Sequence, residues 1–195
     1  FGAEIGLEYQ ITSTIKATAA ASYGQYLYGN NPNLKINDDA QATLTNTQPV
    51  VDFGKAYLKN YRLPGMPQTA ASLGLEYRDP NFWWVGANIN YLADSYLDIS
   101  NITRTDNFSI DGATGDNYSG ANEETVRKAL KQEKFANFNL LNLTGGKSWR
   151  IDTTTIGFFA SINNALDTTY KTGGFEQSRK ATFPDLQADN ANGTP

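Results

Sequence analysis

Residues 70–91 read AASLGLEYRDPNFWWVGANINY, two stretches of alternating side chains joined by a short polar segment. Successive side chains of a strand point to opposite faces, so a period of two residues predicts a strand with one apolar and one polar face. The apolar positions are Ala71, Leu73, Leu75 and Tyr77, then Trp83, Val85, Ala87, Ile89 and Tyr91. Asp79, Pro80 and Asn81 between them favour a tight turn. The stretch therefore predicts an antiparallel hairpin.

Four further segments alternate in the same way. Residues 1–11 and 15–24 flank a turn at 12–14, and residues 141–148 and 156–163 flank a turn at 151–153. Segments of about ten residues are long enough to cross a bilayer as tilted strands. The sequence has no run of about eighteen apolar residues, so it predicts no transmembrane helix. We expect six antiparallel strands.

The polar face of these segments is compatible with two architectures. It carries Glu4, Glu8, Gln10, Lys16, Glu76, Asn88, Asn90 and Asn142. In a soluble sandwich such residues face water and the apolar residues face a core. In a large membrane barrel the apolar residues face lipid and the polar ones line a wet lumen. Alternation alone does not decide between them.

Connection lengths and aromatic positions favour the barrel. The three tight turns alternate with three long connections, at residues 29–68, 98–137 and 171–195. This asymmetry is typical of outer-membrane barrels, whereas compact soluble domains seldom contain repeated long loops. Aromatic residues also gather at segment ends, as in interfacial girdles. They are Tyr9, Tyr77, Phe82, Trp83 and Trp149 near the turns, and Tyr23, Tyr26, Tyr28, Tyr91, Tyr96 and Tyr170 toward the long connections. The predicted fold class is all-β: an antiparallel transmembrane β-barrel, here a partial wall of about six strands with short periplasmic turns and long extracellular loops.

Three motifs in series resemble the barrel of TonB-dependent receptors. The first is residues 63–78, with Pro64 and Pro67 before a small-polar strand that ends in Tyr77 and Arg78. The second is the rising strand at residues 86–91. The third is residues 161–170, SINNALDTTY, which is similar to the penultimate strand of those receptors. Residues 30–33 and 171–177 are similar to receptors of the Bacteroidota group.

The resemblance implies a role as well as a fold. Residues 1–195 would be a partial C-terminal segment of the receptor barrel, without the plug domain, the earlier strands and the last strand. The whole receptor would lie in the cell outer membrane, in contact with lipid and lipopolysaccharide. It would bind a scarce solute, glycan or peptide at the surface and import it, driven by the TonB–ExbB–ExbD system through the plug; a surface lipoprotein is a further partner.

The amino-acid composition limits the kinds of chemistry that the chain could carry out. The chain has no Cys and no His, which removes thiol chemistry and the commonest general base and metal ligand. Its net charge of −4 gives no electrostatic support for nucleic-acid binding. Neither a nucleophile elbow nor a phosphate-binding glycine loop occurs in the sequence. We therefore predict no enzyme activity, no cofactor and no nucleic-acid partner.

Several groups of polar residues can be interpreted either as functional sites or as ordinary structural features. Asp106, Asp111 and Asp116 would suit calcium, but their spacing fits no EF-hand loop, which favours a solvated loop and no metal site. Glu4, Glu8 and Glu76 are expected to line the lumen rather than act as paired catalytic carboxylates. Asn163, Asn164 and Asp167 are expected to end a strand and begin a loop. Residues 123–132 predict a short helix inside a long loop, and residues 189–195 a polar tail.

The candidate ligand-binding residues are aromatic side chains of the outer loops, which could stack on a sugar or peptide. They are Tyr26, Tyr28, Tyr57, Tyr61, Phe108, Tyr118 and Phe175. Two alternative functions remain open at this point: a non-transporting outer-membrane barrel or adhesin with a structural role, and a soluble carbohydrate-binding β-sandwich.

Overall fold

A computed structural model describes residues 1–38, 40, 42–43, 45–47, 49–174, 176 and 181–191. The chain divides into two compact units, and each is described by itself. The first, here the sheet unit, comprises Phe1–Tyr26, Gly65–Tyr96 and Lys134–Thr172. The second, here the loop unit, comprises Leu27–Pro64, Leu97–Glu133 and Gly173–Pro195.

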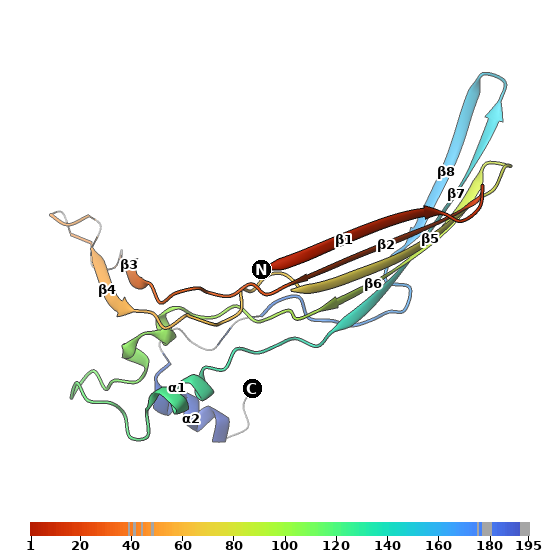
Figure 1. Cartoon of the computed structure of the whole chain (residues 1–195). Helices are drawn as coiled ribbons and strands as arrows, with labels where there is room; N and C mark the ends of the chain where they lie inside the picture. Colours follow the sequence, from red (N-terminus) through yellow and green to blue (C-terminus); the bar gives the residue numbers. More distant parts are fainter. Residues whose placement is uncertain are drawn as a thin grey trace. The chain divides into compact units, whose positions relative to one another are not determined.

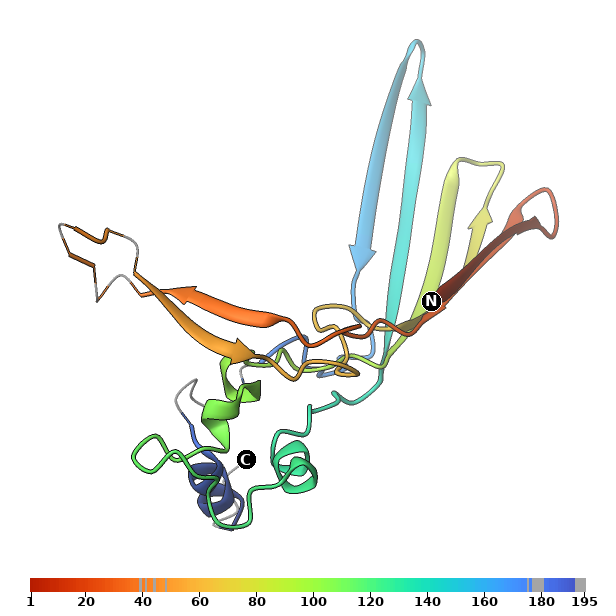
Figure 2. The ribbon, with the colours of Figure 1, turned by 60° about the vertical axis from the view of Figure 1, so that its left-hand side comes forward.

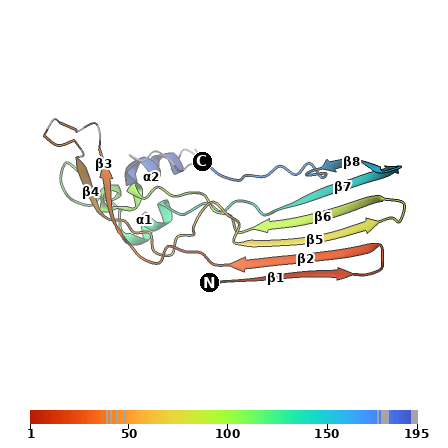
Figure 3. The ribbon, with the colours of Figure 1, turned by 90° about the horizontal axis from the view of Figure 1, so that it is seen from above.

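The sheet unit is a single antiparallel sheet whose six strands follow one another in chain order (Figures 1 and 3). The strands are β1 (Gly2–Gln10), β2 (Ile15–Gly24), β5 (Thr69–Arg78), β6 (Trp83–Ala93), β7 (Phe138–Ile151) and β8 (Thr154–Ile162). The six predicted segments are confirmed, although β7 is longer at both ends than expected. Strands β1 and β8 each have one neighbour, so the sheet is open.

The three tight turns lie at one end of this sheet (Figures 2 and 3). The turn between β5 and β6 is held by Asp79, whose carboxylate accepts the Asn81 N–H at 2.8 Å and the Tyr77 hydroxyl at 2.8 Å. Phe82 closes this turn with a φ of 63°. At the opposite end Tyr23 pairs with Thr69 and Thr69 with Ala93, so the long connections leave side by side. The predicted alternation of short and long connections is confirmed.

Apolar side chains are in register across the sheet and are exposed. One row runs Leu7, Ala19, Leu73, Ile89 and Leu141 through five neighbouring strands. Leu73 is 61% exposed and Phe158 is 64% exposed, and Val85 and Ile89 are exposed as well. These four side chains do not converge on a dry interior. Within the described residues of this unit, no second layer of structure covers the apolar face.

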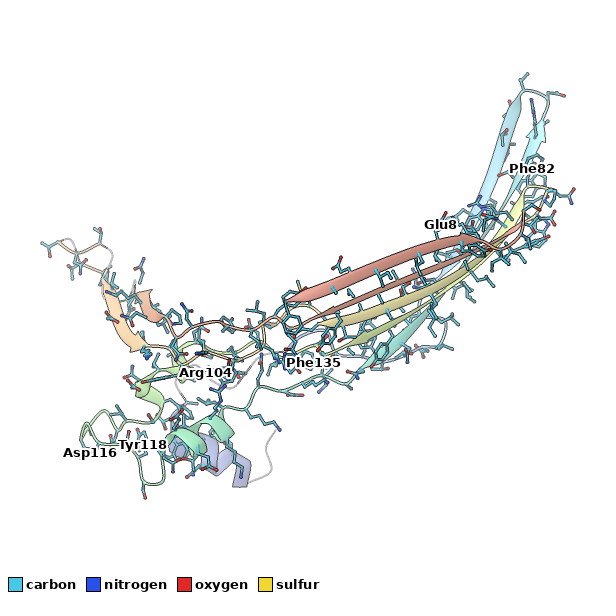
Figure 4. The ribbon with its side chains drawn as sticks, in the orientation of Figure 1. Glu8, Phe82, Arg104, Asp116, Tyr118 and Phe135 are labelled. Carbon is cyan, nitrogen blue, oxygen red and sulfur yellow. The ribbon has the colours of Figure 1, made fainter. Side chains whose placement is uncertain are left out.

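The opposite face carries a connected polar network. Asn90 Nδ2 donates to Asn88 Oδ1 at 2.6 Å, and Asn88 Nδ2 donates to Ser72 Oγ at 2.7 Å. Nearer the turns, Lys16 pairs with Glu8 at 3.4 Å and Arg78 with Glu76 at 2.6 Å; Glu8 is labelled in Figure 4. Glu8 and Glu76 are therefore paired with cations and not with each other.

Gly146 makes room for an aromatic side chain on this polar face. A Cβ at Gly146 would lie 2.7 Å from Trp84 Nε1 and 2.8 Å from the Phe158 carbonyl oxygen, so both neighbours would have to shift. We expect Gly146→Ala to lower the free energy of unfolding by about 1–3 kcal/mol, the usual cost of overpacking. Chemical denaturation of the purified full-length protein measures this difference.

Gly6 provides the matched control for that substitution. It lies in β1 on the same face, and a Cβ there would meet no atom within 4 Å. Gly6→Ala should leave the unfolding free energy unchanged or slightly raised, because alanine restricts the unfolded chain. Equal destabilisation by both substitutions would contradict the steric explanation.

The loop unit contains all the other described elements. They are β3 (Asn33–Asn37), β4 (Val50–Lys55), η2 (Ile102–Arg104), η3 (Asp106–Phe108), α1 (Glu123–Ala129) and α2 (Phe183–Ala191). The predicted loop helix is confirmed as α1, although it ends three residues before the predicted end. The β3–β4 hairpin was not predicted. The predicted polar tail is wrong at residues 189–191, which belong to α2; residues 192–195 lie outside the described part.

The described hydrophobic core lies mainly in the loop unit. One cluster contains Ala56, Leu58, Tyr61 and Ile99, with Tyr28 and Leu34 against it. The other contains Phe108, Leu130 and Phe183, with Tyr118, Val126 and Leu186 among its neighbours. Phe108 and Phe183 meet edge to face, with ring centroids 6.1 Å apart. The loops are thus packed like a small globular domain, and the sheet is not. In the described residues, no helix has both the length and the apolar character to cross a membrane.

Candidate functional site

A cavity of about 530 Å³ opens within the loop unit. This volume falls in the range of small-ligand sites, about 300–1,000 Å³. Its lining combines aromatic rings, side-chain amides, hydroxyls and charges of both signs. The polar and aromatic lining residues are Asn31, Tyr57, Lys59, Asn60, Tyr61, Thr103, Arg104, Thr105, Asp106, Ser109, Asn117, Asn122, Glu123 and Arg127.

One wall is a tight bend at residues 56–61. The Leu58 N–H donates to Ala56 O and the Tyr61 N–H to Leu58 O, both at 3.0 Å. Asn60 has a φ of 73°, a left-handed conformation that asparagine tolerates better than most residues. The bend presents Tyr57 and Tyr61 to the same cavity, although Tyr57 is 43% exposed and Tyr61 is buried.

Tyr57 is fixed at both ends. Its N–H donates to Arg104 O at 2.7 Å, and its hydroxyl interacts with Asp106. The hydrogen bond to Asp106 is the main reason why the pKa of Tyr57 is raised, followed by desolvation and then by the charges of Asp106 and Glu123. Tyr57 therefore stays neutral, with its ring held at the cavity wall.

Tyr61 lies between two guanidinium groups. The Arg104 guanidinium carbon is 4.7 Å from the ring centroid and that of Arg127 is 4.9 Å away, distances at which a cation is attracted to an aromatic face. The Tyr61 hydroxyl donates to Leu130 O at 3.0 Å. This ring supports the cavity wall.

Arg104, which is labelled in Figure 4, contacts residues of all three long connections. Its side chain is 1% exposed, and its two terminal nitrogens each donate to the Glu176 carboxylate at 2.5 Å. Further bonds reach Ser100 O and Leu130 O, both at 3.1 Å. Arg104 comes from the second connection, Tyr61 from the first and Glu176 from the third. A bidentate arginine–carboxylate pair is geometrically specific, so it defines how these connections meet.

The wall opposite the bend is built on α1. Asn122 Oδ1 accepts the Thr125 N–H at 3.0 Å, and the Asn122 N–H donates to Thr125 Oγ1 at 2.9 Å. This reciprocal cap satisfies two backbone donors at the start of the helix. Val126 and Leu130 then pack against the Phe108 cluster, which directs Glu123 and Arg127 to the cavity.

The predicted ligand-binding residues are divided between different environments. Tyr57 and Tyr61 line the cavity. Tyr28 packs against the Ala56 cluster, and its pKa is raised, first by burial and then by the charge of Asp98. Phe108, which is 2% exposed, and Tyr118 belong to the core rather than to a binding surface. Tyr26 lies in the sheet unit, and Phe175 lies outside the described residues.

The other polar groups weighed from the sequence are also placed. Asn164 has a φ of 51°, accepts the Thr168 N–H at 3.0 Å and donates to Thr168 O at 3.1 Å. The prediction that a strand ends here is confirmed. Asp111 accepts the N–H of Ala113 in its own loop. Asp106, Asp111 and Asp116 do not form a group of metal ligands in the described structure.

The sequence analysis did not identify Arg104, nor two glutamines whose side-chain amides hydrogen-bond to backbone N–H and C=O groups of distant residues. Gln132 Oε1 accepts the Arg62 N–H at 2.8 Å, and its Nε2 donates to Arg62 O at 2.9 Å and to Leu97 O at 2.8 Å. In the sheet unit, Gln68 pairs with both backbone groups of Tyr26 in the same way. These partners lie 35 to 70 residues away in the chain, so no local pattern marks them.

Comparison with known proteins adds no assignment, because no protein-family model matches the chain and no curated protein matches it significantly.

Proposed function

We propose that this chain forms part of the wall and outer loops of a TonB-dependent transporter of the bacterial outer membrane. The whole receptor binds a scarce nutrient at the cell surface and imports it into the periplasm. The chain itself supplies scaffolding and selectivity. The resemblance of residues 63–78, 86–91 and 161–170 to such receptors is one support for this proposal.

The observation that carries the proposal is the uncovered, in-register apolar face of the sheet. Leu7, Leu73, Val85, Ile89 and Phe158 are exposed, and with their neighbours they extend over all six strands. Apolar surface in water costs about 25 cal/mol per Å². Large contiguous patches of this kind therefore mark interaction surfaces. Lipid removes this cost along the whole face at once, while the polar network of the other face lines a wet lumen.

Aromatic residues are distributed on the sheet as membrane anchoring requires. Tyr77 and Trp83 lie at the turn end with ring centroids 5.1 Å apart, and Trp149 occupies the same end of β7. Tyr23 and Tyr91 lie toward the long connections. Two aromatic bands separated by aliphatic rows suit the two headgroup levels of a bilayer.

The open edges of the sheet support a larger assembly. Unpaired backbone groups at an edge are costly in hydrocarbon, which has no water to satisfy them. In the proposed receptor, further strands of the same protein pair with β1 and β8 and close the barrel. The TonB–ExbB–ExbD system then acts through the receptor's plug, and the long loops face lipopolysaccharide and any surface lipoprotein partner.

Transport is tested by solute depletion in the native bacterium. Four strains are compared, with and without the full-length receptor and with and without TonB, and mass spectrometry follows solutes that disappear from the medium. We expect at least one solute whose depletion requires both proteins, because import is driven through TonB. If removal of the receptor changes no TonB-dependent depletion, the transport function is excluded and a structural barrel or adhesin is favoured.

A further inference from the structure

We infer that the 530 Å³ cavity of the loop unit is a binding site for a neutral, polyhydroxylated solute such as an oligosaccharide. This inference deepens the proposed function, since it names the chemical class of the solute captured by the outer loops. It rests on three properties of the lining: its charge balance, its exposed aromatic ring and its uncommitted amides.

The charges of the cavity cancel. The positive charge of Arg104 is neutralised by its ion pair with Glu176. The remaining charged lining residues are two cations, Lys59 and Arg127, and two anions, Asp106 and Glu123. An anionic ligand would bring its charge close to two carboxylates, and a cationic ligand would meet two cations. Like-charge contacts of this kind oppose binding, and a buried unpaired charge is costly. A neutral ligand with many hydrogen-bonding groups has neither cost.

Tyr57 provides the apolar contact that a sugar ring requires. Tyr57 is 43% exposed, its backbone N–H donates to Arg104 O at 2.7 Å, and its hydroxyl interacts with Asp106. The axial C–H groups of a sugar are weakly positive and pack on the negative face of an aromatic ring. Because the ring is already immobilised, binding costs little additional side-chain entropy.

Asn60 and Asn117 supply hydrogen-bonding amide groups for a polar ligand. Both line the cavity, and their side chains make no hydrogen bond within the described part of the chain. A primary amide donates and accepts at once, as a hydroxyl does, so amides suit ligands whose every polar group has both capacities. Thr105 and Ser109 add hydroxyls of the same dual character at the lining.

Calorimetric titration of the full-length receptor, purified in detergent, tests the site. The neutral probes are maltotriose, cellotriose and xylotriose. The comparators are trigalacturonic acid, the cationic trimer of glucosamine, and trialanine. We expect at least one neutral trisaccharide to bind, and to bind more tightly than any comparator. Tighter binding of an acidic, basic or peptide probe, or no binding of any neutral trisaccharide, would overturn the assignment.

Variants then locate the binding. We expect Tyr57→Ala to weaken the trisaccharide by at least about 10-fold, because the stacked ring contributes both burial and geometry. Tyr57→Phe keeps the ring and should bind within about 5-fold of the parent, since one hydrogen bond is worth about 1 kcal/mol. Asn117→Ala should give an intermediate loss. Tyr170→Ala is the matched control, because Tyr170 is a similarly exposed tyrosine of the sheet unit, at 41%.

The outcomes separate this site from the proposed transport. If a trisaccharide binds in a Tyr57-dependent way but cells show no TonB-dependent depletion, the binding-site assignment stands and the transport proposal is overturned. If cells deplete a solute in a TonB-dependent way and Tyr57→Ala does not change that depletion, the transport proposal stands and the binding-site assignment is overturned. Equal weakening by Tyr57→Ala and Tyr170→Ala also overturns the site assignment.

Discussion

In the proposed outer-membrane receptor, Ile89→Arg is expected to abolish membrane assembly, and Asn90→Arg is expected to be tolerated. Ile89 is near the middle of β6 on the apolar face, between Leu73 and Leu141. An arginine facing lipid at mid-bilayer costs about 2–4 kcal/mol. That cost corresponds to about 30- to 700-fold in an equilibrium constant. Asn90 is the next residue at nearly the same depth, but it lies on the polar face.

Surface labelling on intact cells measures this assembly. Residues 1–195 contain no cysteine, so a cysteine placed at exposed Ala113 in a long loop reports the loop's arrival outside. An impermeant maleimide should label this cysteine in the parent and in the Asn90→Arg variant, and only at background level in Ile89→Arg. Ala87→Arg and Asn88→Arg repeat the comparison two residues away. Equal loss of labelling on both faces would contradict the lipid-facing assignment.

Arg104→Met is expected to loosen the loop unit without affecting the sheet unit. The substitution leaves the Glu176 carboxylate with the Ser100 N–H, at 2.6 Å, as its remaining described hydrogen bond. Breaking a buried ion pair at one partner costs about 3–5 kcal/mol. We expect the lower end, about 3 kcal/mol, because Glu176 keeps 19% exposure to water. Hydrogen–deuterium exchange of the full-length protein should accelerate in residues 97–133 and stay unchanged in β5 and β6.

Two further variants separate this ion pair from the aromatic contact. Arg127 also lies against the Tyr61 ring, but it is exposed, and within the described residues its side chain makes a single hydrogen bond, to Lys59 O at 3.2 Å. Arg127→Met should therefore cost less than about 1 kcal/mol, as exposed cation–aromatic contacts do. Adding Glu176→Gln to Arg104→Met should recover part of the loss, because no uncompensated charge remains. Similar exchange in the Arg104→Met and Arg127→Met variants would show that the ion pair is not responsible.

The strands of the sheet could be predicted because each carries its own signal. Residues 15–24 alternate except at Ala20 and lie next to a turn-forming segment, and β2 has the same bounds. The β3–β4 hairpin was missed because its alternation is short and is displaced by a bulge between Leu34 and Lys35. The predicted segment at residues 141–148 was too short at both ends, because the apolar alternation of β7 is weak and strand pairing extends beyond it. Pairing with β6 begins at Phe138, and pairing with β8 continues to Ile151.

The loop unit was harder to predict because distant residues hold it together. A local signal for α2 does exist. At the helix start Asp185 Oδ2 accepts both the Thr182 hydroxyl, at 2.6 Å, and the Thr182 N–H, at 2.8 Å, with Pro184 in the first turn. The role of Arg104 has no such signal, because Glu176 lies 72 residues away. Aromatic composition indicated Tyr57 and Tyr61, but it did not distinguish them from Phe108 and Tyr118, since both groups are tyrosines or phenylalanines in long connections.

The placement of the hydrophobic core sets how each unit can tolerate sequence change. Within the described residues of the sheet unit, no second layer packs on Leu73 or Ile89, so one aliphatic residue can replace another there at little cost. In the Phe108 cluster, by contrast, a change of one methylene alters packing against Phe183 and Leu130. The strands of the sheet unit can therefore change in side-chain shape while they conserve polarity, whereas the loop unit must conserve shape where its aromatic rings pack against one another.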